Sequence, residues 1–234
     1  MILAILQARM SSSRLPGKVM LPLAGAPMLA RQIERLKRSR LIDRLVVATS
    51  DRDEDEGVAA LASSVGVDSF RGSLENVLDR FYKAALPYRP KLVVRVTGDC
   101  PLADWEVIDG CISLAIEDGY DYASNSLTRT WPDGLDVEVF TFAALETAWR
   151  EAKDPFELEH VTPFLHRHPE RFKLGQYVND IDRSDLRWTV DERSDYEFVG
   201  RIYDRLYPSN PAFTTEDVLN LLANDPTFQE QTNA

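Results

Sequence analysis

Short apolar runs and amphipathic segments alternate along the first part of the chain. The apolar runs are continuous and rich in β-branched residues, as buried strands of a parallel sheet are, and they cover 2–6, 45–49 and 92–97. Apolar residues at helical spacing occupy the segments between and after them, at 28–37, 58–65 and 74–85. This βαβαβ order predicts an α/β fold with a parallel, doubly wound sheet.

The second part of the chain continues the alternation with shorter strands. Helical spacing recurs at 106–117, 142–153, 156–166, 194–206 and 215–223. Apolar runs indicate strands at 121–124, 137–142, 172–178 and 186–190. Thr214 stands three residues before Asp217, which is a capping signal for the last helix. With no repeat or linker visible, we predict a single domain over 1–234, with halves at 1–104 and 105–228.

The order of strands and helices predicts where a ligand would bind. In doubly wound sheets, ligands lie beyond the carboxyl ends of the strands, so the loops at 7–18, 70–77 and 98–103 are candidates for ligand binding.

Acidic residues crowd 51–56, just before a predicted helix. Negative charge at a helix N-terminus favours the macrodipole, so we interpret this acidic run as a helix start.

Composition and charge narrow the class of partner. The chain is 44% hydrophobic and 28% charged, with a formal net charge of -11. DNA or RNA binding requires a basic face, so we expect no nucleic-acid partner. Cys100 and Cys111 are the only cysteines, which excludes a disulfide framework and a thiolate zinc site. The N-terminal apolar run is too short for a signal peptide or membrane span, so we expect a cytoplasmic protein with no membrane partner.

The loop after the first apolar run carries a local excess of positive charge. Arg9, Arg14 and Lys18 fall within ten residues that contain no acid. The serines at 11–13 add hydroxyls and closely spaced backbone N–H groups, and Gly17 permits close approach of an anion. The loop is neither a Walker A sequence nor GxGxxG, yet such cations and donors suit a triphosphate. A solvated basic loop with ordinary turn residues is the alternative.

The order of residues in this loop resembles a known family signature. The sugar-acid cytidylyltransferases, which include the CMP-KDO and acylneuraminate synthetases, open with a similar motif, and the branch that this chain most resembles is the spore-coat polysaccharide biosynthesis protein F family. The matching residues are Arg9-x-x-Ser12-x-Arg14-Leu15-Pro16-Gly17-Lys18 and then Pro22-Leu23-x-Gly25-x-Pro27-Met28-Leu29.

The resemblance implies a fold and an activity. The fold would be a three-layer, Rossmann-like nucleotidyltransferase fold with a mostly parallel central sheet and a small subsidiary lobe. The activity would be transfer of CMP from CTP to a sugar acid of the ulosonic type, with release of pyrophosphate, for cell-surface polysaccharide synthesis. Residues 1–104 would bind the nucleotide, and 105–228 would bind the acceptor and form a homodimer. A glycosyltransferase that uses a nucleotide-sugar is the alternative enzyme.

The same resemblance assigns residues to the nucleotide. Arg9, Lys18 and Asp99 would be catalytic. The triphosphate would be held by the first loop and the loop that faces it, through Ala8, Arg9, Ser11, Ser12, Ser13, Arg14, Lys18 and Gly98. The base and ribose would meet a middle segment that comprises Arg71, Gly72, Ser73, Asn76 and Arg80. From the local sequence alone, Ser73 can also be a simple helix N-cap.

Two strand-end carboxylates are candidate ligands for Mg²⁺. Asp99 follows the apolar run 92–97, and Asp191 follows the run that ends in Trp-Thr-Val. Mg²⁺ takes one or two protein carboxylates and completes its shell with phosphate oxygens and water. The resemblance assigns both residues this role. Aspartates are also common turn formers, which is the alternative for each, and Asp104 and Asp182 are weaker candidates.

A third group of residues would meet the acceptor. The segment around Trp131, Asp136 and Glu138 combines an aromatic ring with carboxylates that can accept hydrogen bonds from sugar hydroxyls. His160 lies in a segment that resembles the part of the family near the sugar. An acidic surface turn leading into a strand is an equal alternative for 131–138.

Overall fold

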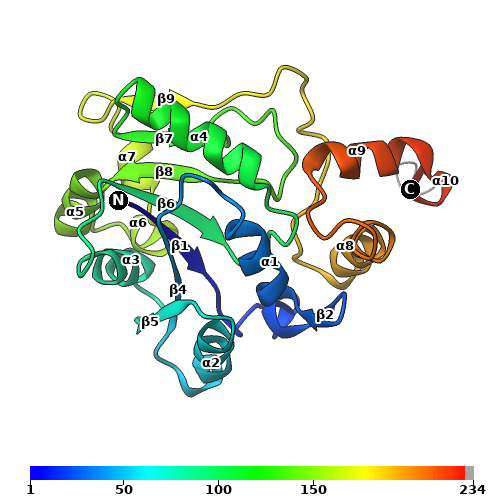
Figure 1. Cartoon of the computed structure of the whole chain (residues 1–234). Helices are drawn as coiled ribbons and strands as arrows, with labels where there is room; N and C mark the ends of the chain where they lie inside the picture. The colour runs from blue at the N-terminus through cyan, green and yellow to red at the C-terminus, as the bar shows by residue number, and fades with distance from the viewer. Residues whose placement is uncertain (230–234) are drawn as a thin grey trace.

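The computed structural model describes residues 1–229 and is built on one seven-stranded sheet in the order β5-β4-β1-β6-β8-β7-β9 (Figure 1). The strands are β1 (Ile2–Gln7), β4 (Arg44–Ser50), β5 (Asp68–Gly72), β6 (Leu92–Thr97), β7 (Tyr122–Ser124), β8 (Glu138–Thr141) and β9 (Leu174–Gln176). From β5 to β6 the strands are parallel, whereas β8 runs antiparallel to both β6 and β7. The predicted α/β class with a mostly parallel sheet is confirmed.

Helices cover both faces of this sheet. They are α1 (Met28–Leu36), α2 (Glu56–Ser64), α3 (Val77–Ala85), α4 (Trp105–Glu117), α5 (Phe142–Glu151), α6 (Pro155–His160), α7 (Pro163–His166), α8 (Arg193–Leu206), α9 (Thr215–Asn224) and α10 (Pro226–Gln229). Short 3₁₀ turns, η1 (Lys18–Met20) and η2 (Asp53–Asp55), and an antiparallel pair, β2 (Pro22–Leu23) with β3 (Ala26–Pro27), complete the elements.

The alternation of side chains along each strand divides the core into two layers. In β1, Ala4 and Leu6 join the core that includes α1, α2 and α4, whereas Leu3 and Ile5 join the core that includes α3 and α5. All four side chains are fully buried. Successive side chains of a strand point to opposite faces, so a strand that is apolar at every position must be covered on both sides. This arrangement is the expected three-layer sandwich.

Two elements of the second half differ from the sequence prediction. The predicted helix 156–166 is broken into α6 and α7, because Val161 has a φ of 73° and Pro163 starts the second piece. Proline has no backbone N–H to donate and is tolerated in the first turn of a helix but not in its interior. The predicted strand 186–190 forms only one isolated bridge, between Asp133 and Arg187.

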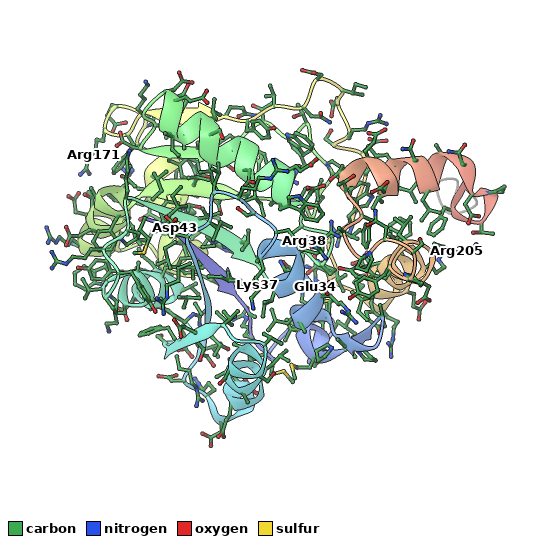
Figure 2. The ribbon with its side chains drawn as sticks, viewed as in Figure 1. Glu34, Lys37, Arg38, Asp43, Arg171 and Arg205 are labelled. Carbon is green, nitrogen blue, oxygen red and sulfur yellow. The ribbon has the colours of Figure 1, made fainter. Side chains whose placement is uncertain are left out.

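The C-terminal helices form a small group beside the main sheet. Figure 1 shows α8, α9 and α10 to one side, with α8 the nearest of them to α1 and β2, and together with the β2–β3 pair they make up the expected subsidiary lobe. Thr214 and Asp217 make the predicted capping box at the start of α9. Arg205 of α8, labelled in Figure 2, pairs with Asp225 after α9 at 3.4 Å.

The last five residues of the predicted domain, 230–234, lie outside the described residues. None of the helices within 1–229 is long and apolar enough to cross a membrane.

Candidate functional site

The carboxyl ends of β1 and β6 and the loop after β1 enclose a cavity of about 270 Å³. Nine of the residues predicted to meet the triphosphate or the metal line it: Ala8, Arg9, Ser12, Ser13, Arg14, Lys18, Gly98, Asp99 and Asp191. Ser11 does not line it, and its hydroxyl is buried without a hydrogen-bond partner among the described residues. The predicted phosphate loop and the two predicted metal carboxylates therefore share one cavity.

The loop after β1 is closed by its own backbone. The N–H groups of Ser12 and Gly17 both donate to the carbonyl of Met10, each at 2.9 Å. Gly17 has a φ of 71°, a left-handed conformation that glycine adopts without steric cost. A Cβ on Gly98 would come within 3.0 Å of both Ala8 Cβ and Gln7 O, so glycine lets the loop after β6 approach the loop after β1. These constraints hold the backbone of the loop at the cavity that its cations line.

A buried carboxylate that the sequence interpretation missed anchors this loop. Asp55 is fully buried, and its Oδ1 accepts the backbone N–H of Met10 at 2.6 Å. Its Oδ2 accepts the N–H of Ser50 at 3.1 Å and the Ser50 hydroxyl. The acidic run at 51–56 is thus more than a favourable helix start, because one of its members ties the end of β4 to the loop after β1. Burial is the property that distinguishes Asp55 from its neighbours, and nothing in the local sequence indicates it.

We expect Asp55→Asn to destabilise the fold and weaken nucleotide binding. An amide turns one acceptor oxygen into a donor, which then faces the N–H groups of Met10 or Ser50 and leaves a buried donor without a partner. Such a loss costs about 1–3 kcal/mol, which urea unfolding measures. Asp53→Asn, at an exposed position of the same turn, is the matched control and should leave the unfolding midpoint unchanged. Equal midpoints for the two variants would show that Asp55 is no anchor.

The centre of the cavity is an ion cluster around Lys18. Its Nζ donates to the carbonyl of Val190 at 2.7 Å, to Asp191 Oδ1 at 3.0 Å and to Asp99 Oδ2 at 3.5 Å. The N–H of Val190 donates to the Asp99 carbonyl at 2.8 Å, which brings the two aspartates together from distant parts of the chain. Burial raises the pKa of Asp191, but the hydrogen bond and charge of Lys18 outweigh it, and the net pKa is lowered.

Arg187, which the sequence interpretation did not select, holds the second oxygen of Asp191. Its guanidinium is 3.0 Å from Asp191 Oδ2, 3.1 Å from Asp133 and 3.2 Å from Asp195. Asp195 in turn accepts the backbone N–H of Asp191 at 2.8 Å. Arg14 also contacts Asp191 Oδ2, at 2.8 Å. The carboxylate of Asp191 is therefore oriented, with Oδ1 turned to Lys18.

The chemistry of this cluster suits a divalent cation that is held mainly by phosphate. Within residues 1–229, no group of three or more His, Cys, Asp or Glu side chains is placed to hold a metal without further ligands. Asp99 and Asp191 nevertheless both contact one cation, the Lys18 ammonium. Two carboxylates completed by phosphate oxygens and water are a usual Mg²⁺ environment. Asp104, a weaker candidate, is buried elsewhere and caps α4 and Thr215.

The middle segment predicted to meet the base lies outside the lining of this cavity. Arg71 donates to the carbonyls of Ser50 and Arg52, at 3.2 and 2.9 Å. The N-cap of α3 is Asn76, whose side chain accepts the N–H of Asp79 at 2.9 Å. Ser73 is therefore not the cap of α3.

Ser73 and Gly72 instead shape the turn between β5 and α3. The Ser73 hydroxyl accepts the N–H of Asn76 at 2.9 Å. Gly72 ends β5, and a Cβ there would lie 2.9 Å from the ring of Phe70 and 3.3 Å from Arg80 Cγ. The turn thus packs tightly against the side chain of Arg80.

Arg80 is the most unusual member of this segment. The side chain is fully buried, and Nη1 donates to the Ser73 carbonyl at 2.8 Å. Nε and Nη2 have no hydrogen-bond partner among the described residues. Burial, with a smaller contribution from the positive charge of Arg9, lowers the pKa of Arg80 to about 10. The positive charge of Arg9 in the phosphate loop therefore adds to the effect of burial on Arg80.

A second cavity of about 560 Å³ adjoins the first, because Arg95 and Thr97 line both. Asp136, Glu138 and His160, all predicted to meet the acceptor, line this second cavity. Trp131 does not. Its ring stacks on Tyr177 with centroids 5.6 Å apart, and both residues line a different cavity. The indole N–H donates to the Tyr177 carbonyl at 3.2 Å, and this bond holds the ring away from the predicted partners.

The acidic residues of the second cavity are already paired with arginines. Glu138 is buried on β8, forms an ion pair with Arg95 and accepts hydrogen bonds from Tyr122, at 2.7 Å, and from Thr162. Burial raises the pKa of Glu138, but Arg95 and these hydroxyls outweigh it, and the net pKa is lowered. Glu138 is therefore not part of an acidic surface turn.

The Asp136 carboxylate and two histidines complete the walls of the second cavity. Asp136 accepts two hydrogen bonds from Arg129, at 2.6 and 2.8 Å. His160 packs on the ring of Phe156, with centroids 4.3 Å apart. His166 also lines the cavity, and burial lowers its pKa. The cavity thus offers imidazoles and paired ions rather than free carboxylates.

The chain is similar to known proteins over nearly its full length. A family model described as Cytidylyltransferase matches residues 3–214. The spore coat polysaccharide biosynthesis protein SpsF of Bacillus subtilis is 34% identical over 233 residues, which cover 96% of this chain and 95% of that protein. A solved cytidylyltransferase from Leptospira borgpetersenii has a TM-score of 0.92 at 33% identity, over 97% of this chain and 95% of that chain. A CMP:2-keto-3-deoxy-manno-octonic acid synthetase complexed with CTP has a TM-score of 0.69 at 16% identity, over 87% of this chain and 98% of that chain, a likeness of fold alone.

Proposed function

The chain belongs to the cytidylyltransferase family, and from this premise we propose that it transfers CMP from CTP to a sugar acid of the ulosonic type and releases pyrophosphate. The observation that carries the proposal is the convergence of Arg9, Arg14 and Lys18 with the two aspartates Asp99 and Asp191 around one cavity. The product would serve cell-surface polysaccharide synthesis. A homodimer in the cytoplasm stays a prediction.

The cations of the first loop suit the triphosphate of CTP. Arg9 and Arg14 have planar guanidinium groups that can bind phosphate oxygens through two N–H groups at once. They would hold the β- and γ-phosphates and stabilise the charge that develops on the leaving pyrophosphate. Phosphoryl-type transfers depend on positioning and charge stabilisation more than on covalent help from the protein. This chain would therefore need no nucleophile of its own, and the pKa of the nearby Cys100 thiol is raised by burial.

Asp99 and Asp191 would hold Mg²⁺ in this scheme. When bound, the metal supplies charge neutralisation at the α-phosphate and lowers the pKa of a coordinated hydroxyl. Arg187 and Asp195 would keep Asp191 in place for this task, since both contact its carboxylate or its backbone. The two aspartates therefore form the protein share of a metal site that the nucleotide completes.

The acceptor would enter through the adjoining second cavity. Arg95 and Thr97 separate the two cavities, so a sugar hydroxyl in the second can face an α-phosphate in the first. In-line attack by this hydroxyl would form the sugar–phosphate bond as the bond to pyrophosphate breaks. His160, His166 and the Ser126 hydroxyl are polar groups of this cavity that can hydrogen-bond an acidic sugar.

A matrix of substrates tests the proposal. Four nucleoside triphosphates are combined with several ulosonic acids and Mg²⁺, and released pyrophosphate is measured. We expect release only with CTP and only when a sugar acid is present. Release with another triphosphate, or with neutral sugars alone, would contradict the proposed substrates. Consumption of a nucleotide-sugar with release of a nucleoside diphosphate would instead identify a glycosyltransferase.

A further inference from the structure

Each of the three N–H donors of the Lys18 ammonium group has an acceptor within the protein. A lysine ammonium has three N–H donors and no acceptor. In Lys18 they point to the Val190 carbonyl at 2.7 Å, Asp191 at 3.0 Å and Asp99 at 3.5 Å. The side chain is only 10% exposed, so water cannot readily replace a lost partner. Lys18 can therefore bind a phosphate oxygen only if one of these three acceptors releases it.

Two of those acceptors are the carboxylates proposed to bind metal. A divalent cation shared by Asp99 and Asp191 would stand close to where the Lys18 ammonium stands now. Like charges at contact distance in a poorly solvated site repel strongly. The metal and Lys18 thus compete for the same two carboxylates. Arg14 and Arg187 contact one oxygen of Asp191, Oδ2. The other oxygen, Oδ1, contacts Lys18 and is the one for which the metal and Lys18 compete.

We infer that Lys18 is an exchangeable positioning residue. Its ammonium holds Asp99 and Asp191 together, and it moves to the polyphosphate when a divalent cation takes the two carboxylates. The inference rests on the proposed function, because it takes these aspartates as the metal ligands. It makes metal and polyphosphate binding mutually dependent, since each favours the arrangement that the other needs. Lys18 and the phosphate-loop cations line one cavity, so the move is a side-chain rearrangement.

Mn²⁺ binding in the absence of nucleotide tests the exchange. Affinity is measured by electron paramagnetic resonance for the wild type, Lys18→Met and Arg9→Met. We expect Lys18→Met to bind Mn²⁺ more tightly, by about 5- to 150-fold, the usual range of coupling between two sites. Arg9→Met removes a charge from the same cavity but makes no ion pair with either aspartate, so its affinity for Mn²⁺ should rise much less than that of Lys18→Met.

The possible results separate the exchange from the proposed function. If the wild type binds Mn²⁺ together with CTP but Lys18→Met gains no affinity for Mn²⁺ alone, the exchange is wrong and the metal site stands. If neither protein binds Mn²⁺ with or without CTP, the proposed metal site fails and the exchange fails with it. Arg9→Met gaining as much affinity as Lys18→Met would mean that general charge, not the contact, is responsible.

A second measurement covers the case in which Lys18→Met does not fold. Lys18 is the only buried lysine within residues 1–229, so its ¹⁵N ammonium signal should be the one protected from exchange with water. Adding Mg²⁺ and CTP to the wild type should shift this signal. A signal that stays in place while both ligands bind would overturn the exchange. Lys18→Gln, which keeps a donor for the Val190 carbonyl, offers a further variant for the Mn²⁺ titration.

Discussion

Asp99→Asn should lower kcat for pyrophosphate release from CTP by about 10²–10³-fold. The carboxylate is 30% exposed after the end of β6, and its side chain contacts the Lys18 ammonium and the Cys100 thiol. Asparagine has nearly the same shape, so the fold should be kept while the charge needed for metal and phosphate is lost. The rate is measured at saturating CTP and Mg²⁺ with a sugar acid that the wild type accepts.

Asp182→Asn is the matched control for this experiment. Asp182 was a weaker metal candidate in the sequence, and it lies on an exposed turn where it accepts the N–H of Ser184 at 2.9 Å. We expect its rate to equal that of the wild type, because it does not line the cavity that holds Asp99. A near-normal rate for Asp99→Asn, or equal losses for both variants, would refute the role proposed for Asp99.

Glu138→Gln should destabilise the protein by about 3–5 kcal/mol, the usual cost of leaving one charge of a buried ion pair alone. Glu138 is the anionic partner of Arg95, and its oxygens also accept hydrogen bonds from Tyr122 and Thr162. Urea unfolding at neutral pH measures the loss. Replacing both charges, as in Arg95→Met with Glu138→Leu, should cost less than Glu138→Gln alone, because no unpaired charge stays buried.

The pH dependence of stability provides a check on the same residue. The folded pKa of Glu138 lies below its usual value of 4.5, so its contribution is fully present above that pH and is lost as pH falls through the folded pKa. The wild type should therefore lose stability in acid more steeply than Glu138→Gln. Glu157→Gln is the control, since Glu157 is also buried but lies 4.0 Å from its nearest cation, Arg167. If Glu138→Gln and Glu157→Gln lose the same small amount, the ion pair does not stabilise the core.

Local sequence was sufficient to predict the strands that are formed by continuous apolar runs. β6 has the predicted bounds, β1 extends the predicted run by one residue at its end, and β4 extends it by one residue at each end. The agreement is close because a continuous β-branched run has few alternatives to a buried parallel strand. β5 was missed, since Asp68–Gly72 is an edge strand with polar, partly exposed residues and no apolar period. The break at Val161 was also missed, because a positive φ in a β-branched residue is imposed by packing and not by preference.

By itself, the sequence determined the α/β alternation and the charge and backbone chemistry of the loop after β1, because these depend on residues close together in the chain. The tertiary structure alone decided which distant groups meet. It paired Asp99 with Asp191 around Lys18, buried Asp55 beneath the loop, joined Arg187 to Asp191, and took Trp131 away from the acceptor cavity. Such contacts depend on how strands and loops from separate parts of the chain are brought to one edge of the sheet. The local pattern of polar and apolar residues does not specify which residues, far apart in sequence, come into contact there.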